Sequence, residues 1–176
     1  ALIFLRVDLK KSPSLFEVKK EACLGYIVFV MECTVVSTWD FGSIAVGEAQ
    51  KKLLEGCSAI DAVEAGIRAV EADDAAQYFV GKGGLPNSLG KMECDAAVMD
   101  HESRLGAVLA IPHTQHAVTA ARKAMENGPH NVYASEGAAQ FASEVGLQRY
   151  SSEIIRSLYP PLGPSRPFSF SLPTPL

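Results

Sequence analysis

The chain contains 176 residues, of which 48% are hydrophobic and 20% are charged, and its formal net charge is −4. These values are typical of a soluble globular protein of about one domain. A negative chain without a basic stripe gives no electrostatic reason to expect a nucleic-acid partner. The most apolar run, residues 23–31, is shorter than the roughly 20 residues that a membrane span needs. We therefore interpret this run as a buried strand and expect no membrane partner.

The sequence divides into three parts. Residues 1–33 match no pattern that we recognise and are interpreted as an N-terminal extension. Residues 34–150 alternate in an orderly way between strand and helix signals and form the predicted domain. Residues 151–176 contain six of the ten prolines. Because proline lacks a backbone donor, we expect a disordered or extended tail there.

The first half of the predicted domain begins with a β-branched segment, residues 34–39, which favours a strand. Ser43 is expected to cap a helix that Gly56 ends. Ser58, with Asp61 three residues later, resembles a capping box at the start of a second helix. Apolar residues at helical spacing then give that helix one buried stripe, formed by Ile60, Val63, Ile67 and Val70.

The second helix is expected to end in the acidic run 71–74, because acidic side chains oppose the helix dipole at a C-terminus. Three charged residues fall largely off its buried stripe, namely Glu64, Arg68 and Glu71. A glycine-rich loop follows at 81–84. Its glycines permit positive φ and a close approach of the backbone, but the order of residues is not that of a phosphate-binding loop.

The second half of the domain begins with two short predicted strands, residues 95–100 and 106–111, joined by a polar turn and paired as a hairpin. A helix over 116–125, stopped by Asn127-Gly128-Pro129, and a short strand over 131–134 follow. Ser135 is expected to cap a last helix, which Gly146 closes. This order predicts an α/β (α+β) protein whose helices pack on a largely antiparallel sheet.

Four segments of the chain occur in the order and spacing of one known family. They are VSTWDFG at 36–42, SAIDAVEAGIRAV at 58–70, VGKGGLPNSLGKMECDAAVMD at 80–100, and the stretch 121–130. Together they resemble the α chain of the glycosylasparaginases, which are asparaginase type 2 members of the N-terminal-nucleophile (Ntn) hydrolases. The resemblance implies an incomplete αββα sandwich. It also implies that the complete enzyme hydrolyses the amide bond of N4-(β-N-acetylglucosaminyl)-L-asparagine.

The resemblance also implies a substrate pocket. Its Ser-Thr-Trp segment lines the pocket in the family, so Thr38 and Trp39 become binding candidates here, with a structural tryptophan at a strand end as the alternative for Trp39. Gly83 and Gly84 belong to the glycine loop that lies near the substrate. Within that segment the chain departs from the family at two positions, because Phe79 replaces a serine and Lys82 replaces an aromatic residue.

Other polar residues are interpreted as structural. Asp95 lines up with a Leu-Asp-Ala segment of the family, and a carboxylate at the start of an apolar strand has to be paired if it is buried. His113 and His116 form an HxxH pattern that lacks a third ligand, so no metal site and no cofactor are expected. The cysteines contain no CxxC pair, and free thiols are favoured over two disulfides for Cys23, Cys33, Cys57 and Cys94.

The family's nucleophile is a threonine that self-cleavage places at the N-terminus of a second chain. Its hydroxyl attacks the side-chain amide, and its α-amine, with an ordinary pKa of roughly 7.7–8.0, acts as the base. The family's context is missing around every threonine of this chain, namely Thr34, Thr38, Thr114, Thr119 and Thr174. The sequence thus predicts no catalytic residue here, a chain that is inactive alone, and a missing partner chain that carries the threonine.

Two alternatives to a glycosylasparaginase stay open. An asparaginase or isoaspartyl peptidase is disfavoured, because the Ala-Gly-x-Gly-Ser/Thr sodium loop is absent and Leu85-Pro86-Asn87 leans toward the glycosylasparaginase branch. A non-catalytic truncated fragment or pseudoenzyme is supported by the unmatched ends of the chain. A lysosomal, vacuolar or secretory location is implied by the resemblance alone.

Overall fold

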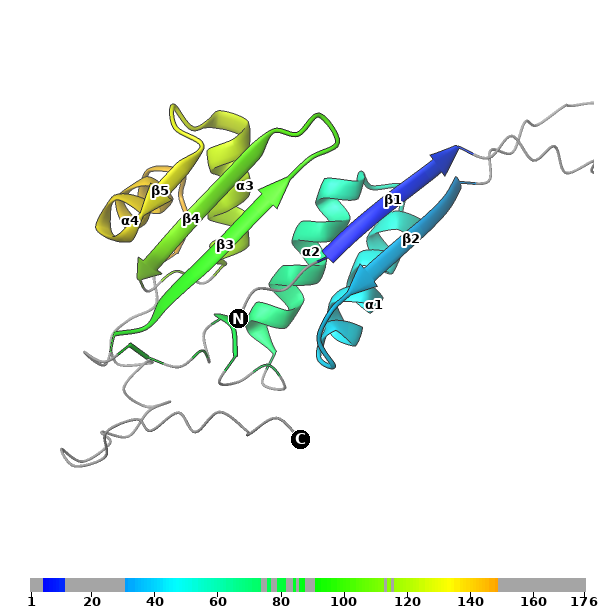
Figure 1. The fold of residues 1–176 in the computed structure, drawn as a ribbon, viewed down its shortest axis with the longest axis horizontal. Helices are drawn as coiled ribbons and strands as arrows, with labels where there is room; N and C mark the ends of the chain where they lie inside the picture. The colour runs from blue at the N-terminus through cyan, green and yellow to red at the C-terminus, as the bar shows by residue number, and fades with distance from the viewer. Residues whose placement is uncertain are drawn as a thin grey trace, which may run out of the picture.

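The computed structural model describes residues 5–11, 31–73, 76, 79–81, 84, 86–87, 91–112, 114 and 116–148. The strand predicted at 23–31 lies outside these residues except for Met31, and the predicted tail at 151–176 lies outside them entirely. In the described part, strands form one layer and helices lie behind them (Figure 1). The predicted α/β class is confirmed, and this arrangement is what half of an αββα sandwich requires.

The first two strands form a separate antiparallel pair. Strand β1, Leu5–Lys11, pairs with β2, Met31–Ser37, so that Leu5 lies opposite Ser37. The prediction of a strand over 34–39 is wrong at both ends, and β1 was not predicted. Strand β2 begins earlier because β1 supplies a partner, and it ends at Ser37 because the chain then turns, with the Gly42 N–H donating to the Trp39 carbonyl at 2.7 Å.

Helices α1, Gly42–Leu54, and α2, Ala59–Ala72, lie behind this strand pair (Figure 1). The expected cap at Ser43 is wrong: Phe41 holds that position, and the Ser43 hydroxyl donates instead to the Asp40 carbonyl at 3.1 Å. The predicted end at Gly56 is confirmed, because its φ of +82° is the left-handed conformation that closes a helix.

The capping box at the start of α2 is confirmed. The Ser58 hydroxyl accepts from the Asp61 N–H at 3.3 Å, and the Asp61 carboxylate accepts from the Ser58 N–H at 3.2 Å. This hydrogen bonding from Ser58, aided by Arg122, holds the pKa of Asp61 below its ordinary value. Of the predicted stripe, Ile67 and Val70 are buried, and Ile60 and Val63 are half-buried.

The second sheet has the order β3-β4-β5. Strands β3, Glu93–Met99, and β4, Leu105–Pro112, form the predicted antiparallel hairpin, while β5, Val132–Ala134, adds to β4 in parallel. The sheet is therefore mixed. The hairpin register shifts at Asp95, whose carboxylate accepts from the Ala110 N–H at 2.7 Å and holds Ala110 at a φ of +46°. This contact fits the structural role expected for Asp95.

Helices α3, Ala117–Asn127, and α4, Ser135–Glu144, cover the back of this sheet (Figure 1). The prediction that Ser135 caps α4 is wrong, because Ala134 is the cap and Ser135 is already helical. The predicted closure at Gly146 is confirmed, with the Leu147 N–H donating to the Ala142 carbonyl at 2.9 Å. The core between helices and sheet is lined mainly by alanine and β-branched residues, including Val98, Val108, Ile111, Val118 and Ala121.

Gly106 permits the close contact between β4 and α3. A β-carbon at this position would collide with the Ala121 carbonyl oxygen and would lie 2.5 Å from the Met125 backbone nitrogen. The front of the same sheet is open and apolar, since Met99, Leu105 and Leu109 are 64%, 40% and 46% exposed. Among the helices that the structure describes, none has the length and apolar character required to cross a membrane.

Candidate functional site

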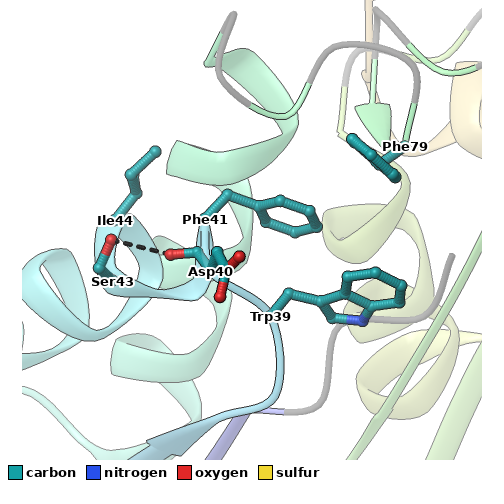
Figure 2. Close-up of a pocket in the computed structure, with 6 residues that line it drawn as sticks. All are labelled: Trp39, Asp40, Phe41, Ser43, Ile44 and Phe79. Carbon is teal, nitrogen blue, oxygen red and sulfur yellow. Dashed lines mark hydrogen bonds between the residues drawn. The ribbon is translucent and has the colours of Figure 1, made fainter.

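An aromatic cluster marks the point where β2 turns into α1. Trp39 lies in the turn, Phe41 caps the helix, and Phe79 reaches the same place from the segment that follows α2 (Figure 2). The turn is tight because residue 42 is a glycine: a β-carbon there would collide with the Ser37 hydroxyl. The turn that holds Trp39 therefore depends on glycine at position 42.

The three rings surround an open pocket. The ring centroids of Trp39 and Phe41 are 5.7 Å apart with planes 8° from parallel, and Phe79 lies 6.0 Å from Trp39 and 5.6 Å from Phe41. Trp39 and Phe79 are 44% and 48% exposed. The pocket has a volume of about 490 Å³ and is lined by Trp39, Asp40, Phe41, Ser43, Ile44 and Phe79 (Figure 2). Exposed aromatic side chains around a hollow of this size are typical of a binding site.

The predicted site residues are placed unequally around this pocket. Trp39 lines it, whereas Thr38 is exposed beside it and Gly84 is buried in the loop, with its N–H donating to the Gly81 carbonyl at 3.1 Å. Gly83 lies outside the described residues. Phe41 was not predicted to belong to the site, and Phe79 was noted only as a departure from the family. The signal in the sequence that points to Phe41 is its position two residues after the single tryptophan.

The loop that carries Phe79 is seated on the end of α2. Gly81 has a φ of +66°, and a β-carbon on it would collide with the Glu71 carbonyl oxygen. On the other side, the Cys94 thiol donates to the Gly81 carbonyl at 3.6 Å. These contacts fix the backbone two residues after Phe79, so α2 and β3 together position one wall of the pocket.

Glu71 is buried beneath this loop, although its position off the apolar stripe predicted otherwise. Its carboxylate accepts from the Val118 N–H at 3.1 Å and lies 3.3 Å from the Nδ1 of His116. Burial raises the pKa of Glu71, and the contacts with His116 and Val118 oppose that rise. Helix α3 has no cap from its own first residues, so Glu71 provides a remote one at the positive end of the helix. A helix start at His116, without a capping side chain, is the signal in the sequence that such a partner is needed.

The other reactive side chains are held by structural contacts. The Cys94 thiol is half-buried, and desolvation together with the negative charges of Glu71 and Asp95 raises its pKa to about 12, so it is a neutral thiol and a poor nucleophile. The Thr119 hydroxyl donates to Glu64 at 2.6 Å, and the Thr114 hydroxyl donates to the Pro112 carbonyl at 3.3 Å. Thr174 lies outside the described residues.

No group of three His, Cys, Asp or Glu side chains within the described ranges is arranged to hold a metal ion. His116 contacts Glu71 instead, and His113 lies outside the described residues. The cysteines Cys33, Cys57 and Cys94 are free thiols, as the sequence favoured, while Cys23 is not among the residues described.

A family model described as Asparaginase matches residues 30–159 of the chain. An N(4)-(β-N-acetylglucosaminyl)-L-asparaginase of Elizabethkingia miricola is 41% identical over 115 residues, which are 65% of this chain and 34% of that protein. The enzyme of that name from Rattus norvegicus is 35% identical over 128 residues, 71% of this chain and 36% of the other. An isoaspartyl peptidase of Salmonella typhimurium is 39% identical over 111 residues, which are 62% of this chain and 35% of that protein. The chain spans about a third of the length of these curated relatives.

Proposed function

Because this chain belongs to the asparaginase family, we propose that it is the α-subunit-like part of an amidohydrolase with an N-terminal nucleophile. The proposed reaction is hydrolysis of the amide bond in N4-(β-N-acetylglucosaminyl)-L-asparagine. The observation that carries this proposal is the 41% identity over 115 residues with a protein named for that activity. The exposed Trp39 that lines the pocket supports it, since an accessible aromatic side chain can contact a ligand.

In this proposal the chain supplies the wall of the pocket and a second chain supplies the chemistry. The hydroxyl of an N-terminal threonine on that second chain attacks the amide carbonyl carbon, and its own α-amine accepts the hydroxyl proton. The C–N bond then breaks, the nitrogen leaves with a proton as the glycosylamine, and water hydrolyses the resulting ester. The threonines with described hydrogen bonds, Thr114 and Thr119, are engaged in structural contacts, which supports a nucleophile from elsewhere.

Hydrolysis of isoaspartyl peptides or of asparagine is the second candidate. Relatives named isoaspartyl peptidase are nearly as similar, at 39% identity for the Salmonella protein and 38% for an isoaspartyl peptidase/L-asparaginase of Homo sapiens. The absence of the Ala-Gly-x-Gly-Ser/Thr loop from residues 81–91 favours the glycosylated substrate. A non-catalytic fragment is the third candidate and predicts no hydrolysis in any form of the protein.

The test is to purify the protein from its natural source and determine intact masses and N-terminal sequences. We expect a second chain that begins with threonine, and a complex that hydrolyses glycosylated asparagine faster than an isoaspartyl dipeptide or asparagine. Trp39→Ala in that complex is expected to lower kcat/KM about tenfold or more, since a large contact in the pocket is lost. This chain in isolation is expected to hydrolyse none of the three substrates.

Each other outcome selects a different function. Preference for the isoaspartyl dipeptide would replace the proposed substrate with the second candidate. If no chain that begins with threonine accompanies this polypeptide and none of the three substrates is hydrolysed, the third candidate, a non-catalytic fragment, would be supported.

A further inference from the structure

We propose that Glu71 is a positioning residue for the aromatic pocket. Its buried carboxylate ties the end of α2 to the start of α3, and this tie sets the position of Phe79 against Trp39. Glu71 is not among the residues that line the pocket, so it acts through the segment that carries Phe79. The inference rests on the proposed function only in taking the pocket as a binding wall. The link between Glu71 and the pocket is argued from contacts alone.

The Glu71 carboxylate is held by two partners at the start of one helix. Glu71 is the single charged residue that is buried in the described part of the chain, with 6% of its surface exposed. Its Oε1 accepts from the Val118 N–H at 3.1 Å, and its Oε2 lies 3.3 Å from the Nδ1 of His116. A serine or aspartate at position 116 would cap α3 without burying a charge, which costs free energy. The distant carboxylate, unlike such a local cap, also joins α3 to α2.

Successive hydrogen-bonded turns lead from the end of α2 to Phe79. The Asp73 N–H donates to the Val70 carbonyl at 3.1 Å, and the Ala76 N–H donates to the Asp73 carbonyl at 3.3 Å. The Phe79 N–H then donates to the Ala76 carbonyl at 3.1 Å. Val70 and Ala76 are fully buried in a cluster against which Phe41 also packs. The position of Phe79 relative to the other rings therefore depends on where α2 ends.

A second connection follows Phe79 at Gly81. A β-carbon on Gly81 would collide with the Glu71 carbonyl oxygen and would lie 2.5 Å from the Glu71 α-carbon. The loop thus packs directly on the backbone of the residue whose side chain caps α3. Because Phe79 is held between these two connections to the end of α2, a shift of residue 71 moves Phe79 as well. The ring centroid of Phe79 lies 6.0 Å from that of Trp39, so this movement changes how Trp39 is covered.

The test measures quenching of Trp39 fluorescence by acrylamide in the full chain, where Trp39 is the single tryptophan. Phe79→Ala gives the quenching constant that applies when the neighbouring ring is absent. Glu71→Ala keeps that ring but releases residue 71 from α3. We expect it to raise the quenching constant by at least half of the rise produced by Phe79→Ala. Glu71→Gln keeps an acceptor for the Val118 N–H and is expected to show the wild-type value.

Glu64→Ala is the matched control. Glu64 also ties α2 to α3, since it accepts from the Thr119 hydroxyl at 2.6 Å and from Arg122 at 2.7 Å, but it lies about two helical turns before Glu71. Its removal weakens the same helix pair, and quenching of Trp39 is expected to stay at the wild-type value. Glu71→Met removes both acceptors while nearly keeping the side-chain volume, and it replaces Glu71→Ala in the test if that variant does not fold.

Two results would overturn the proposal. One is wild-type quenching in a folded Glu71→Ala or Glu71→Met variant, and the other is an equal rise with Glu64→Ala or with Glu71→Gln. Circular dichroism verifies that each variant in the comparison is folded. Because no hydrolysis is measured, these results are independent of whether the proposed amidohydrolase activity is found.

Discussion

The two halves of the described chain bury their apolar residues differently. In the sheet half, formed by β3, β4, β5, α3 and α4, one continuous core contains fully buried side chains such as Val108, Ile111 and Val118. In the helix-pair half, formed by β2, α1 and α2, the corresponding cluster consists of Ala45, Val70 and Ala76, while the aromatic rings lie partly exposed around the pocket. Fully buried side chains stabilise the first half, and the large accessible rings of the second half make it suited to binding.

The largest expected effect tests how tightly the sheet half is packed. Gly106→Ala places a β-carbon against the backbone of α3, which cannot move without displacing the helix, and should lower the free energy of unfolding by about 3 kcal/mol or more. Gly47→Ala in α1 is the matched control. Its β-carbon meets nothing within 4 Å, so it should raise the stability by roughly 0.5–1 kcal/mol. Urea unfolding followed by circular dichroism measures both, and equal effects would contradict the contrast between the halves.

An intermediate effect is expected at Glu71, which joins the two halves. Glu71→Ala leaves the buried Val118 N–H without an acceptor and should cost about 1–3 kcal/mol, whereas Glu71→Gln keeps an acceptor. Because the folded pKa of Glu71 is raised above its ordinary value of 4.5, its contribution to stability is present below that value and is lost as the pH rises through the folded pKa. The stability of the wild type relative to Glu71→Gln should therefore fall as the pH rises above 4.5.

The pH dependence is measured by urea unfolding of both proteins at a series of pH values. A wild type that gains stability over Glu71→Gln as the pH rises would mean that the paired, charged form is favoured. In that case the contact with His116 would outweigh the burial of the carboxylate.

The smallest expected effects on stability come from removing the hydroxyl of one serine in each half. Ser58→Ala removes the cap of α2 and should cost about 1 kcal/mol, and it should raise the pKa of Asp61 toward its ordinary value. Ser135 makes no capping hydrogen bond, so Ser135→Ala should change the stability by about 0.5 kcal/mol at most. Thermal unfolding and a carboxylate titration by NMR measure these changes. A larger loss at Ser135 would show that its hydroxyl has a role that the capping geometry does not explain.

The features of the fold that were predicted correctly are those that depend on residues close together in the sequence. The capping box at Ser58 and the hairpin of β3 with β4 were correct because each is encoded within a few residues. The caps at Ser43 and Ser135 were wrong because the chain enters both helices one or two residues earlier, through turns that a capping residue type alone does not define. The pairing of β1 with β2 depends on contact between distant segments, which local patterns do not contain.

The candidate site also combines features that the local sequence predicts with contacts between distant residues that it does not predict. Trp39 was named from its own segment, but its contact with Phe79 and the burial of Glu71 against His116 join residues about 40 positions apart. Neither contact has a local signature. The resemblance to a family drew attention to the glycine loop, whereas the structure shows that Phe79 at the start of that loop is the side chain lining the pocket.

The contact between β4 and α3 has a consequence for how this sequence can vary over evolutionary time. Most tight packing can be rebuilt when one residue grows and its neighbour shrinks. Here the residue on the strand, Gly106, is already the smallest amino acid, and a β-carbon on it would meet backbone atoms of Ala121 and Met125 as well as the β-carbon of Met125. Enlargement of Gly106 therefore has no compensating substitution on the helix, and this point of the fold can change only if the whole helix moves with it.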